Sequence, residues 1–194
     1  KELTHPIQKG NITSFYQDSE GELWIGSWEE GLFRVKADGA IKNFKYNAKN
    51  PHSLSSNFVR ACCEDNLGNI WIGTFNGLNR YNKITGLFQN HTASDTQADG
   101  LTHSSIWCIV KDNQGTLWLG TYFGGVNYFN PEYEIYTRYS YSSNEKKGLS
   151  NPVVGRTIED KDGNLWIGTE GGGLNYYNRR PREFKWYRPQ EGRN

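Results

Sequence analysis

The stretch Leu23-Trp24-Ile25-Gly26 decides the fold, because close copies of it return three more times along the chain. The copies are Ile70-Trp71-Ile72-Gly73, Leu117-Trp118-Leu119-Gly120 and Leu165-Trp166-Ile167-Gly168. Their tryptophans lie 47, 47 and 48 residues apart, so four units of this length account for almost all of the 194 residues. A repeat of about 40–50 residues with strand-like content is typical of stacked supersecondary units such as propeller blades.

Each unit contains four short runs that read as β-strands. In the first unit they are Ile12–Gln17, the LWIGS run, Leu32–Val35 and a run near Ile41–Tyr46, and the other units repeat this order. Gly, Asn, Asp or Pro bounds each run, and no longer window keeps a helical apolar stripe. This pattern predicts antiparallel strands joined by tight turns, with almost no helix.

We therefore predict an all-β fold of β-propeller blades, with four four-stranded antiparallel sheets in one array over residues 1–194. The blades are expected at about residues 12–50, 57–92, 105–140 and 152–190. Four blades can close a small ring, or they can form an open arc of a larger propeller whose end sheets expose apolar faces. The sequence leaves both arrangements open.

The repeated stretch also predicts where the core lies. Side chains alternate along a strand, so Trp and Gly point to one face of the sheet while Leu and Ile point to the other. Both faces are then apolar, as a sheet between two neighbouring sheets requires. We expect four tryptophans in the core between blades, namely Trp24, Trp71, Trp118 and Trp166.

The first run of each unit has small or apolar residues at alternate positions, which suits the strand nearest the propeller axis. Arg156 breaks that pattern. It is expected either to line the central channel or to pair with a carboxylate nearby.

The turn between the first and second runs has the pattern Asp-x-x-Gly in every unit. The pairs are Asp18/Gly21, Asp65/Gly68, Asp112/Gly115 and Asp160/Gly163. The aspartate can accept a backbone N–H, and glycine supplies the positive φ that closes the hairpin. These aspartates could also be read as Ca²⁺ ligands, but no dense group of oxygen ligands surrounds them in sequence. We favour structural turns.

Composition excludes several classes of protein. The 22 basic and 21 acidic residues leave a net charge of +1, which gives no electrostatic footprint for nucleic acid or for an anionic membrane. No apolar run is long enough for a membrane helix or a signal peptide. The chain begins at Lys1 without Met, so we expect a processed or excised piece. Cys62, Cys63 and Cys108 lack metal-ligand spacing and read as buried thiols. We expect no cofactor and no metal.

Around the repeated stretch, the sequence resembles the two-component regulator propeller repeat. The matching segments are QDSEGELWIGSWEEGLFRV (17–35), EDNLGNIWIGTFNGLNRY (64–81), KDNQGTLWLGTYFGGVNYF (111–129) and EDKDGNLWIGTEGGGLNYY (159–177). That repeat occurs in the periplasmic sensor region of Bacteroides-type hybrid two-component systems. The resemblance implies a non-enzymatic ligand-sensing fragment of a sensor histidine kinase/response regulator, located in the periplasm. Any contact with the membrane would then be made only by parts of the full-length protein that are missing here.

Recognition is expected on one rim of the array. The turns between the second and third runs lie on the same rim as the connections between blades, and this rim carries most of the sequence variation. Exposed rings beside amide and carboxylate groups suit a sugar, because the rings stack on C–H faces while the polar groups bind hydroxyls. The candidate contacts are Trp28, Glu29, Phe75, Asn76, Tyr122, Phe123 and Glu170. Three further residues near the starts of the inner strands could reach an anionic group, namely Arg60, Trp107 and Arg156.

The function predicted from these residues is the sensing of an oligosaccharide or another small ligand. The alternative is a protein-interaction or dimerisation module without a small-molecule ligand, whose partner is a set of further blades or a second copy of the chain. It also remains open that the rings simply cover the blade edges. Propellers host hydrolases and lyases too, but the four histidines share no spacing, so we assign no catalytic residue.

Overall fold

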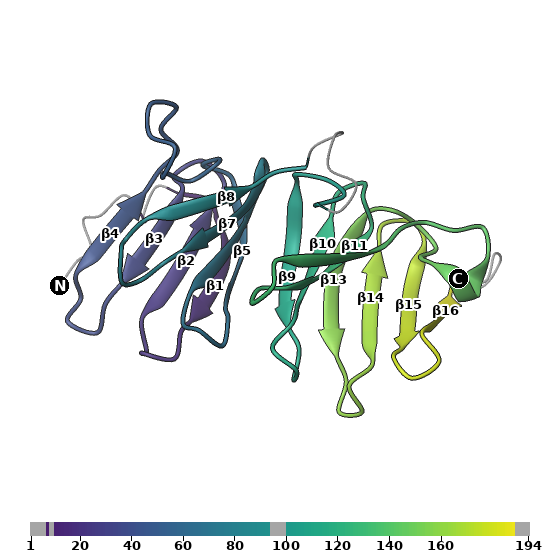
Figure 1. Cartoon of the computed structure of the whole chain (residues 1–194). Coiled ribbons are helices and arrows are strands. Elements are labelled where there is room, and N and C mark those ends of the chain that lie inside the picture. Colours follow the sequence, from purple (N-terminus) through teal and green to yellow (C-terminus); the bar gives the residue numbers. More distant parts are fainter. Residues whose placement is uncertain (1–6, 8–9, 94–99, 189–194) are drawn as a thin grey trace.

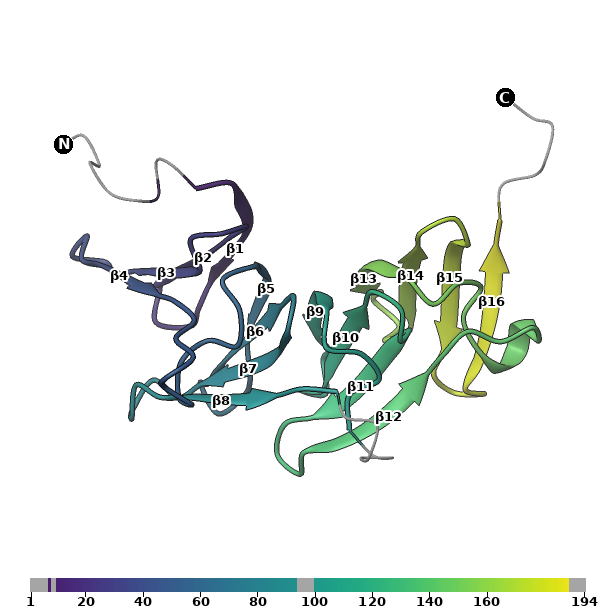
Figure 2. The same cartoon turned by 90° about the horizontal axis from the view of Figure 1, so that it is seen from above.

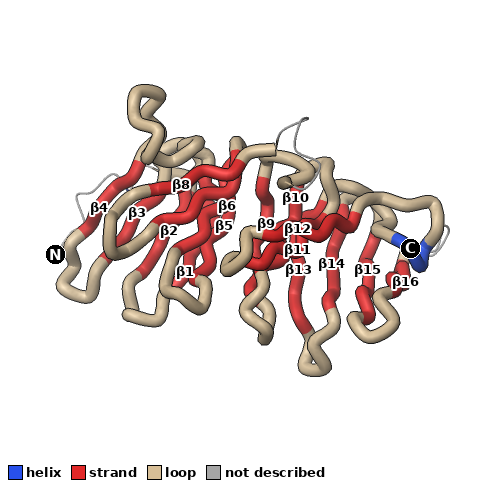
Figure 3. Tube along the Cα trace, viewed as in Figure 1, coloured by secondary structure: helices blue, strands red, loops and turns tan. Residues whose placement is uncertain are grey.

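The computed structural model describes Ile7, residues 10–93 and residues 100–188. The described strands form four antiparallel sheets of four strands each, joined in sequence order (Figures 1 and 3). The first two sheets contain β1 (Ile12–Gln17), β2 (Leu23–Ser27), β3 (Leu32–Val35) and β4 (Ile41–Phe44), then β5 (Val59–Glu64), β6 (Ile70–Thr74), β7 (Gly77–Tyr81) and β8 (Phe88–His91). The last two contain β9 (Ile106–Lys111), β10 (Leu117–Thr121), β11 (Val126–Asn130) and β12 (Ile135–Tyr139), then β13 (Val154–Glu159), β14 (Leu165–Thr169), β15 (Gly173–Asn178) and β16 (Glu183–Tyr187).

The predicted all-β fold is confirmed. The named elements of the described residues include one short 3₁₀ helix, η2 (Glu145–Lys147), between the third and fourth sheets. Each sheet is one blade. The predicted ends of the array, and the end of the fourth blade at residue 190, lie outside the described residues.

The four blades form an open arc and not a closed ring. Seen from above, the sheets fan out around a curve, with β1, β5, β9 and β13 on its inner side and the last strand of each blade on its outer side (Figure 2). The first and fourth blades stand at opposite ends of the arc (Figure 1). The arc therefore has two end sheets, each with a neighbour on one side.

The hydrophobic core is divided into three clusters, each between neighbouring blades. Trp24, Trp71 and Trp118 are 0%, 0% and 1% exposed, and each packs against the next blade. The glycine two residues after each of them leaves room for that blade. A Cβ at Gly73, for example, would lie 2.7 Å from Ile106 Cγ2. Burial between sheets therefore explains why the repeat needs a large ring and a small residue on the same face.

Trp166 departs from the expected core position. It is part-exposed, because no further sheet among the described strands covers that face of the fourth blade. Ile158 on the neighbouring strand is 65% exposed, whereas its counterpart in the third blade, Val110, packs against the Trp118 cluster. The difference comes from position in the arc, because the local sequence around Trp166 is almost the same as around the other three tryptophans.

The Asp-x-x-Gly turns are structural turns that also hold the tryptophans. Asp18 Oδ1 accepts the amide N–H groups of Glu20 and Glu22, and its Oδ2 accepts the indole N–H of Trp24 at 2.9 Å. The second and third blades repeat the indole bond, from Trp71 to Asp65 at 2.7 Å and from Trp118 to Asp112 at 2.8 Å. The glycine that ends each turn has φ near +80°. Each of these buried carboxylates thus accepts hydrogen bonds both from the backbone of its turn and from the indole N–H of a core tryptophan.

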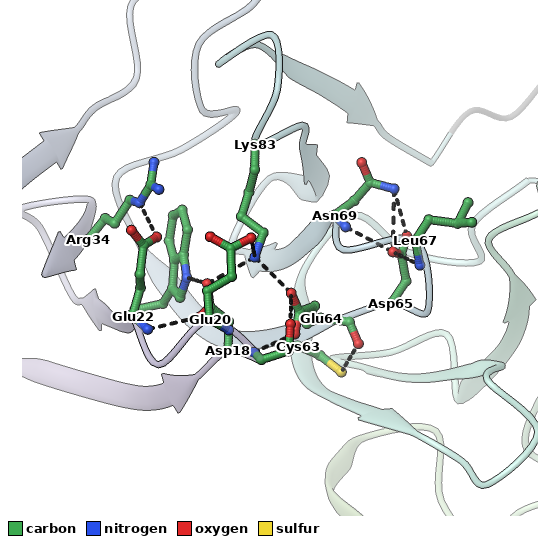
Figure 4. A network of polar contacts seen from close by, with 12 residues as sticks. Asp18, Glu20, Glu22, Arg34, Cys63, Glu64, Asp65, Leu67, Asn69 and Lys83 are labelled. Carbon is green, nitrogen blue, oxygen red and sulfur yellow. Dashed lines mark hydrogen bonds and ion pairs between the residues drawn. The ribbon is translucent and has the colours of Figure 1, made fainter. Parts of the chain in front are cut away.

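An ion-pair network joins the first two blades (Figure 4). Lys83 Nζ lies 3.2 Å from Asp18, 3.0 Å from Glu20 and 2.8 Å from Glu64, and Glu64 also accepts hydrogen bonds from the amide and hydroxyl of Ser19. Burial alone would raise the pKa of Asp18, but the hydrogen bonds from Trp24, the Glu22 amide and Lys83 hold it below its ordinary value. The pKa of Glu64 is likewise lowered, because the hydrogen bonds from Lys83 and Ser19 outweigh its burial.

The third and fourth blades have an equivalent network. Arg179 lies 2.8 Å from Asp112 and 3.3 Å from Glu159. The joint between the second and third blades differs, because Lys111 stands at the strand position of Glu159, and it donates to Asn66. A carboxylate–cation network therefore joins the blades in two pairs.

A buried asparagine fixes each described connection between blades. Asn79 Oδ1 accepts the amide of Ser55, Asn127 Oδ1 accepts that of Thr102, and Asn175 Oδ1 accepts that of Ser150. All three asparagines are fully buried on the third strand of their blade. These bonds hold the connecting segments against the rim where the candidate site lies.

Candidate functional site

The inner strand of every blade has a bulge at the same place. In the second blade Val59 pairs with Thr74 and Ala61 with Gly73, so Arg60 is the extra residue. The bulge residues of the four blades are Thr13, Arg60, Trp107 and Gly155. A bulge bends its strand and redirects the inserted side chain. In each blade the bulge thus places one residue, close to the rim, outside the regular alternation of side chains between the two faces of the sheet.

The turns between the second and third strands lie directly beside these bulges. One residue of each turn donates its amide N–H to the carbonyl oxygen just before the inner strand. The pairs are Trp28 to Asn11, Phe75 to Phe58, Tyr122 to Ser105 and Glu170 to Val153, at 2.8–3.1 Å. Four of the predicted contact residues therefore occupy equivalent positions along one rim.

Arg60 stands at the centre of the side chains that meet there. Its guanidinium carbon lies 4.4 Å from the ring centroid of Trp107, 5.0 Å from that of Trp28 and 5.8 Å from that of Phe75. These rings come from three different blades. We call the following residues the Arg60 cluster: Trp28, Phe58, Arg60, Phe75, Trp107, Tyr122 and Phe123.

The rings of the cluster form two groups of three, and Arg60 joins the groups. Trp107 stacks on Tyr122 with centroids 5.1 Å apart, and Tyr122 meets Phe123 at 4.3 Å. On the other side Phe58 lies between Trp28 and Phe75, at 5.4 and 6.1 Å. Three members keep a large exposed surface, because Trp28, Phe75 and Phe123 are 39%, 54% and 57% exposed. The cluster thus presents aromatic faces to the solvent around one cation.

Two N–H donors of the cluster are unsatisfied within the described part of the chain. Arg60 Nε and Trp107 Nε1 are buried and have no hydrogen-bond partner there. Burial lowers the pKa of Arg60, and no carboxylate is among the groups that oppose this effect. The Arg60 cluster therefore has hydrogen-bond donors and a positive charge but no carboxylate of its own.

The structure brings together six of the ten predicted contact residues, namely Trp28, Arg60, Phe75, Trp107, Tyr122 and Phe123. Asn76 and Glu29 lie in the same turns as Phe75 and Trp28 and are exposed, and Glu170 follows in the fourth blade. No recorded ring or cation contact joins these three to the cluster.

Arg156 neither lines a channel nor pairs with a carboxylate in the described residues. It is exposed, and its Nη1 donates to the carbonyl oxygen of Gly155 in its own blade at 3.2 Å. Arg156 stands one residue after the bulge, at the strand position that Ala61 and Cys108 occupy in the preceding blades. In an open arc, that position on the last blade has no neighbour to face.

Two residues near the rim were not predicted. Phe58 is a ring of the cluster, and His103 lies 6.2 Å from Phe123 and 6.4 Å from Tyr122. Both belong to the connection that leads into an inner strand. Their place beside the rim turns follows from the repeat, so the alignment of the four units could have revealed them.

Other reactive groups do not form a second site. Burial raises the pKa of Cys62 to about 12 and that of Cys63 to about 11, so both thiols stay protonated. Within residues 10–93 and 100–188, no group of three or more His, Cys, Asp or Glu side chains is arranged to hold a metal ion. No helix in this part of the chain is long and apolar enough to cross a membrane.

The two-component regulator propeller family matches the sequence four times, at residues 6–29, 53–76, 100–123 and 148–171. Each match includes one repeated tryptophan and one rim turn. No curated protein matches the chain.

Solved structures with the same architecture include two from B. thetaiotaomicron. The extracellular domain of the proposed hybrid two-component system BT4673 is 26% identical, with a TM-score of 0.75, over 91% of this chain and 25% of that one. The corresponding domain of BT3049 is 22% identical, with a TM-score of 0.74, over 90% and 23%. This chain therefore spans about a quarter of the length of either. Virginiamycin B lyase from Staphylococcus aureus shares the fold at 14% identity, with a TM-score of 0.71, over 99% of this chain and 60% of the lyase.

Proposed function

This chain belongs to the two-component regulator propeller family, and on that premise we propose that it is an extracytoplasmic, ligand-sensing segment of a hybrid two-component sensor. The proposal includes a periplasmic location, an oligosaccharide as the ligand, and no catalysis by this segment. The signal would pass to a histidine kinase elsewhere in the full-length protein.

The Arg60 cluster is the observation that carries the ligand proposal. It gathers exposed rings from three blades beside unsatisfied donors, and it does so on the rim where loops are free to vary. Aromatic faces bind the C–H faces of sugars, while N–H donors bind their oxygen atoms. A site built by several blades can also report a change in their relative positions, provided that the ligand binds one arrangement more tightly than another.

We expect the change Trp28→Ala to weaken oligosaccharide binding about ten-fold, because it removes one exposed ring of the cluster. The matched control is Tyr133→Ala, which removes an exposed ring from the turn between β11 and β12 at the opposite rim. Isothermal titration calorimetry on the intact protein, with ligands first selected on a glycan array, measures both. Equal affinities of the two variants, or no binding to any oligosaccharide, would contradict the proposal.

The open face of the fourth blade favours a second candidate function, a module that associates with other blades or with a second copy. Part-exposed Trp166 and exposed Ile158 lie on that face, where the preceding blades have a neighbour. If association is the role of this face, Ile158→Lys should shift the sedimentation coefficient at high protein concentration toward that of the monomer. A protein that stays monomeric at every concentration would remove this candidate.

A further inference from the structure

Arg60 differs from the other part-buried cations in the described part of the chain. Lys83 contacts three carboxylates, Arg179 contacts two, Arg34 pairs with Glu22, and Arg80 pairs with Glu134. Lys111 has no recorded carboxylate partner but donates a hydrogen bond to the side-chain oxygen of Asn66. Arg60 has an aromatic ring on several sides and no recorded ion pair or hydrogen bond. Arg60 is part-buried, and partial burial of a cation without a counter-ion is unfavourable, so a negative partner from outside would stabilise it.

The donors of the cluster indicate which chemistry that partner has. A guanidinium has five N–H donors and no acceptor, and an indole has a single N–H donor. Aromatic rings around Arg60 attract its charge, but they are poor substitutes for oxygen acceptors. Arg60 Nε and Trp107 Nε1 are thus two buried donors from neighbouring inner strands, at side chains that contact each other. Carboxylate and sulfate groups carry only acceptors, and they match the fork of an arginine.

We propose that the Arg60 cluster binds an acidic oligosaccharide, with its carboxylate or sulfate group held by Arg60 and its sugar rings against the exposed aromatic side chains. This inference rests on the proposed sensing function and adds the chemical class of the ligand. A neutral sugar would satisfy the donors only in part and would leave the charge of Arg60 without a counter-ion.

The test compares matched ligands by calorimetry on the intact protein. The probes are a trimer of galacturonic acid, the corresponding trimer of galactose, and a sulfated trisaccharide. We expect one or both acidic ligands to bind about 10- to 100-fold more tightly than the neutral trimer, because charge-assisted hydrogen bonds are stronger than neutral ones. The two acidic probes then distinguish a carboxylate ligand from a sulfate ligand.

Arg60→Gln should remove that preference by reducing the affinity for acidic ligands to the level of the neutral trimer. Arg60→Lys, which keeps the charge but loses the fork, should retain only part of it. Arg180→Gln is the matched control, since it removes an exposed arginine from the turn between β15 and β16 at the opposite rim, and its binding should equal that of the unchanged protein. Equal thermal midpoints show that the variants are folded.

The remaining outcomes separate this inference from the proposed function. Binding of neutral sugars that depends on Trp28 and not on Arg60 would support oligosaccharide sensing and overturn the acidic class. An acidic preference that survives Arg60→Gln would overturn the assignment to Arg60. If no saccharide of either kind binds, the proposed function fails and this inference fails with it.

Discussion

Replacing Trp71 by alanine is expected to lower the free energy of unfolding by about 3–5 kcal/mol, the range found when a buried tryptophan or phenylalanine is truncated. The indole is fully buried between the second and third blades and contacts the ring of Phe129 at 5.0 Å. Its N–H also bonds to the buried carboxylate of Asp65. The change would leave a cavity and would remove one of the hydrogen bonds to Asp65 Oδ2, which would keep only the one from Asn69. Equilibrium denaturation in urea measures the effect.

The matched control for this experiment is Trp166→Ala. The local sequence is nearly the same, but the ring is part-exposed on the last blade. The decrease in the free energy of unfolding should be no more than about half of that for Trp71→Ala, because folding removes less apolar area of Trp166 from water. Equal decreases in the free energy of unfolding at the two positions would show that the indole stabilises the protein through contacts within its own sheet. The account of a core between blades would then be wrong.

Lys83→Met is expected to destabilise the protein by about 3 kcal/mol, because removing one partner of a buried ion pair leaves the opposite charge uncompensated. The lysine side chain is 10% exposed, and the carboxylate of Asp18 beside it is completely buried. Denaturation at neutral pH measures the loss. The double variant Lys83→Met with Glu64→Gln should be more stable than the single one, since it removes a charge from each side.

Lys45→Met provides the surface control, because Lys45 pairs with Glu30 in an exposed position and should contribute at most about 1 kcal/mol. A loss at Lys83 no larger than that at Lys45 would contradict the importance of the buried network.

The same network predicts how stability depends on pH. The folded-state pKa values of Asp18 and Glu64 lie below their ordinary values of 3.8 and 4.5, so the folded protein holds fewer protons there than the unfolded chain. Asp18 and Glu64 contribute fully to stability when the pH lies above their ordinary pKa values. This stabilisation is lost as the pH falls through their lower folded-state pKa values. In Lys83→Met the acid-induced loss between about pH 5 and pH 2 should be smaller, because one cause of the lowered pKa values is gone. Thermal midpoints across that range would show an unchanged slope if the network has no such role.

Much of the fold could be predicted because the repeat states it four times. The strand that carries each tryptophan was expected at the LWIG-like stretches, and the structure has β2, β6, β10 and β14 there. The alternation of Trp and Gly with Leu and Ile also predicted four tryptophans between blades, and three of them lie there. Whether four blades close a ring was not predictable, because closure depends on the angle between neighbouring sheets, which the side chains at three separate interfaces determine together. The exposure of Trp166 follows from that angle.

The sequence predicted on which rim the candidate site lies, but it did not predict how the side chains are arranged around Arg60. The bulge that inserts Arg60 follows from a small mismatch, in which the six residues of β5 pair with the five of β6. A strict alternation misses it. Arg156 was grouped with Arg60 because both lie near the start of an inner strand, although Arg156 stands one position later. The Lys83 network was also missed, since Lys83 and Asp18 are 65 residues apart and the third blade has no equivalent cation. Such pairs depend on how blades meet, a property that no single unit contains.

The division of the core among the spaces between blades has a consequence for how such a chain can grow. A sheet packed between two neighbours has no hydrophobic core of its own, because its core residues lie at the interfaces with those neighbours. Each added blade therefore forms one further interface, and the array still has two end sheets. Gene duplication can therefore lengthen the molecule without redesigning any existing joint. Only the loops along the rim must then diverge for the longer protein to acquire a different specificity.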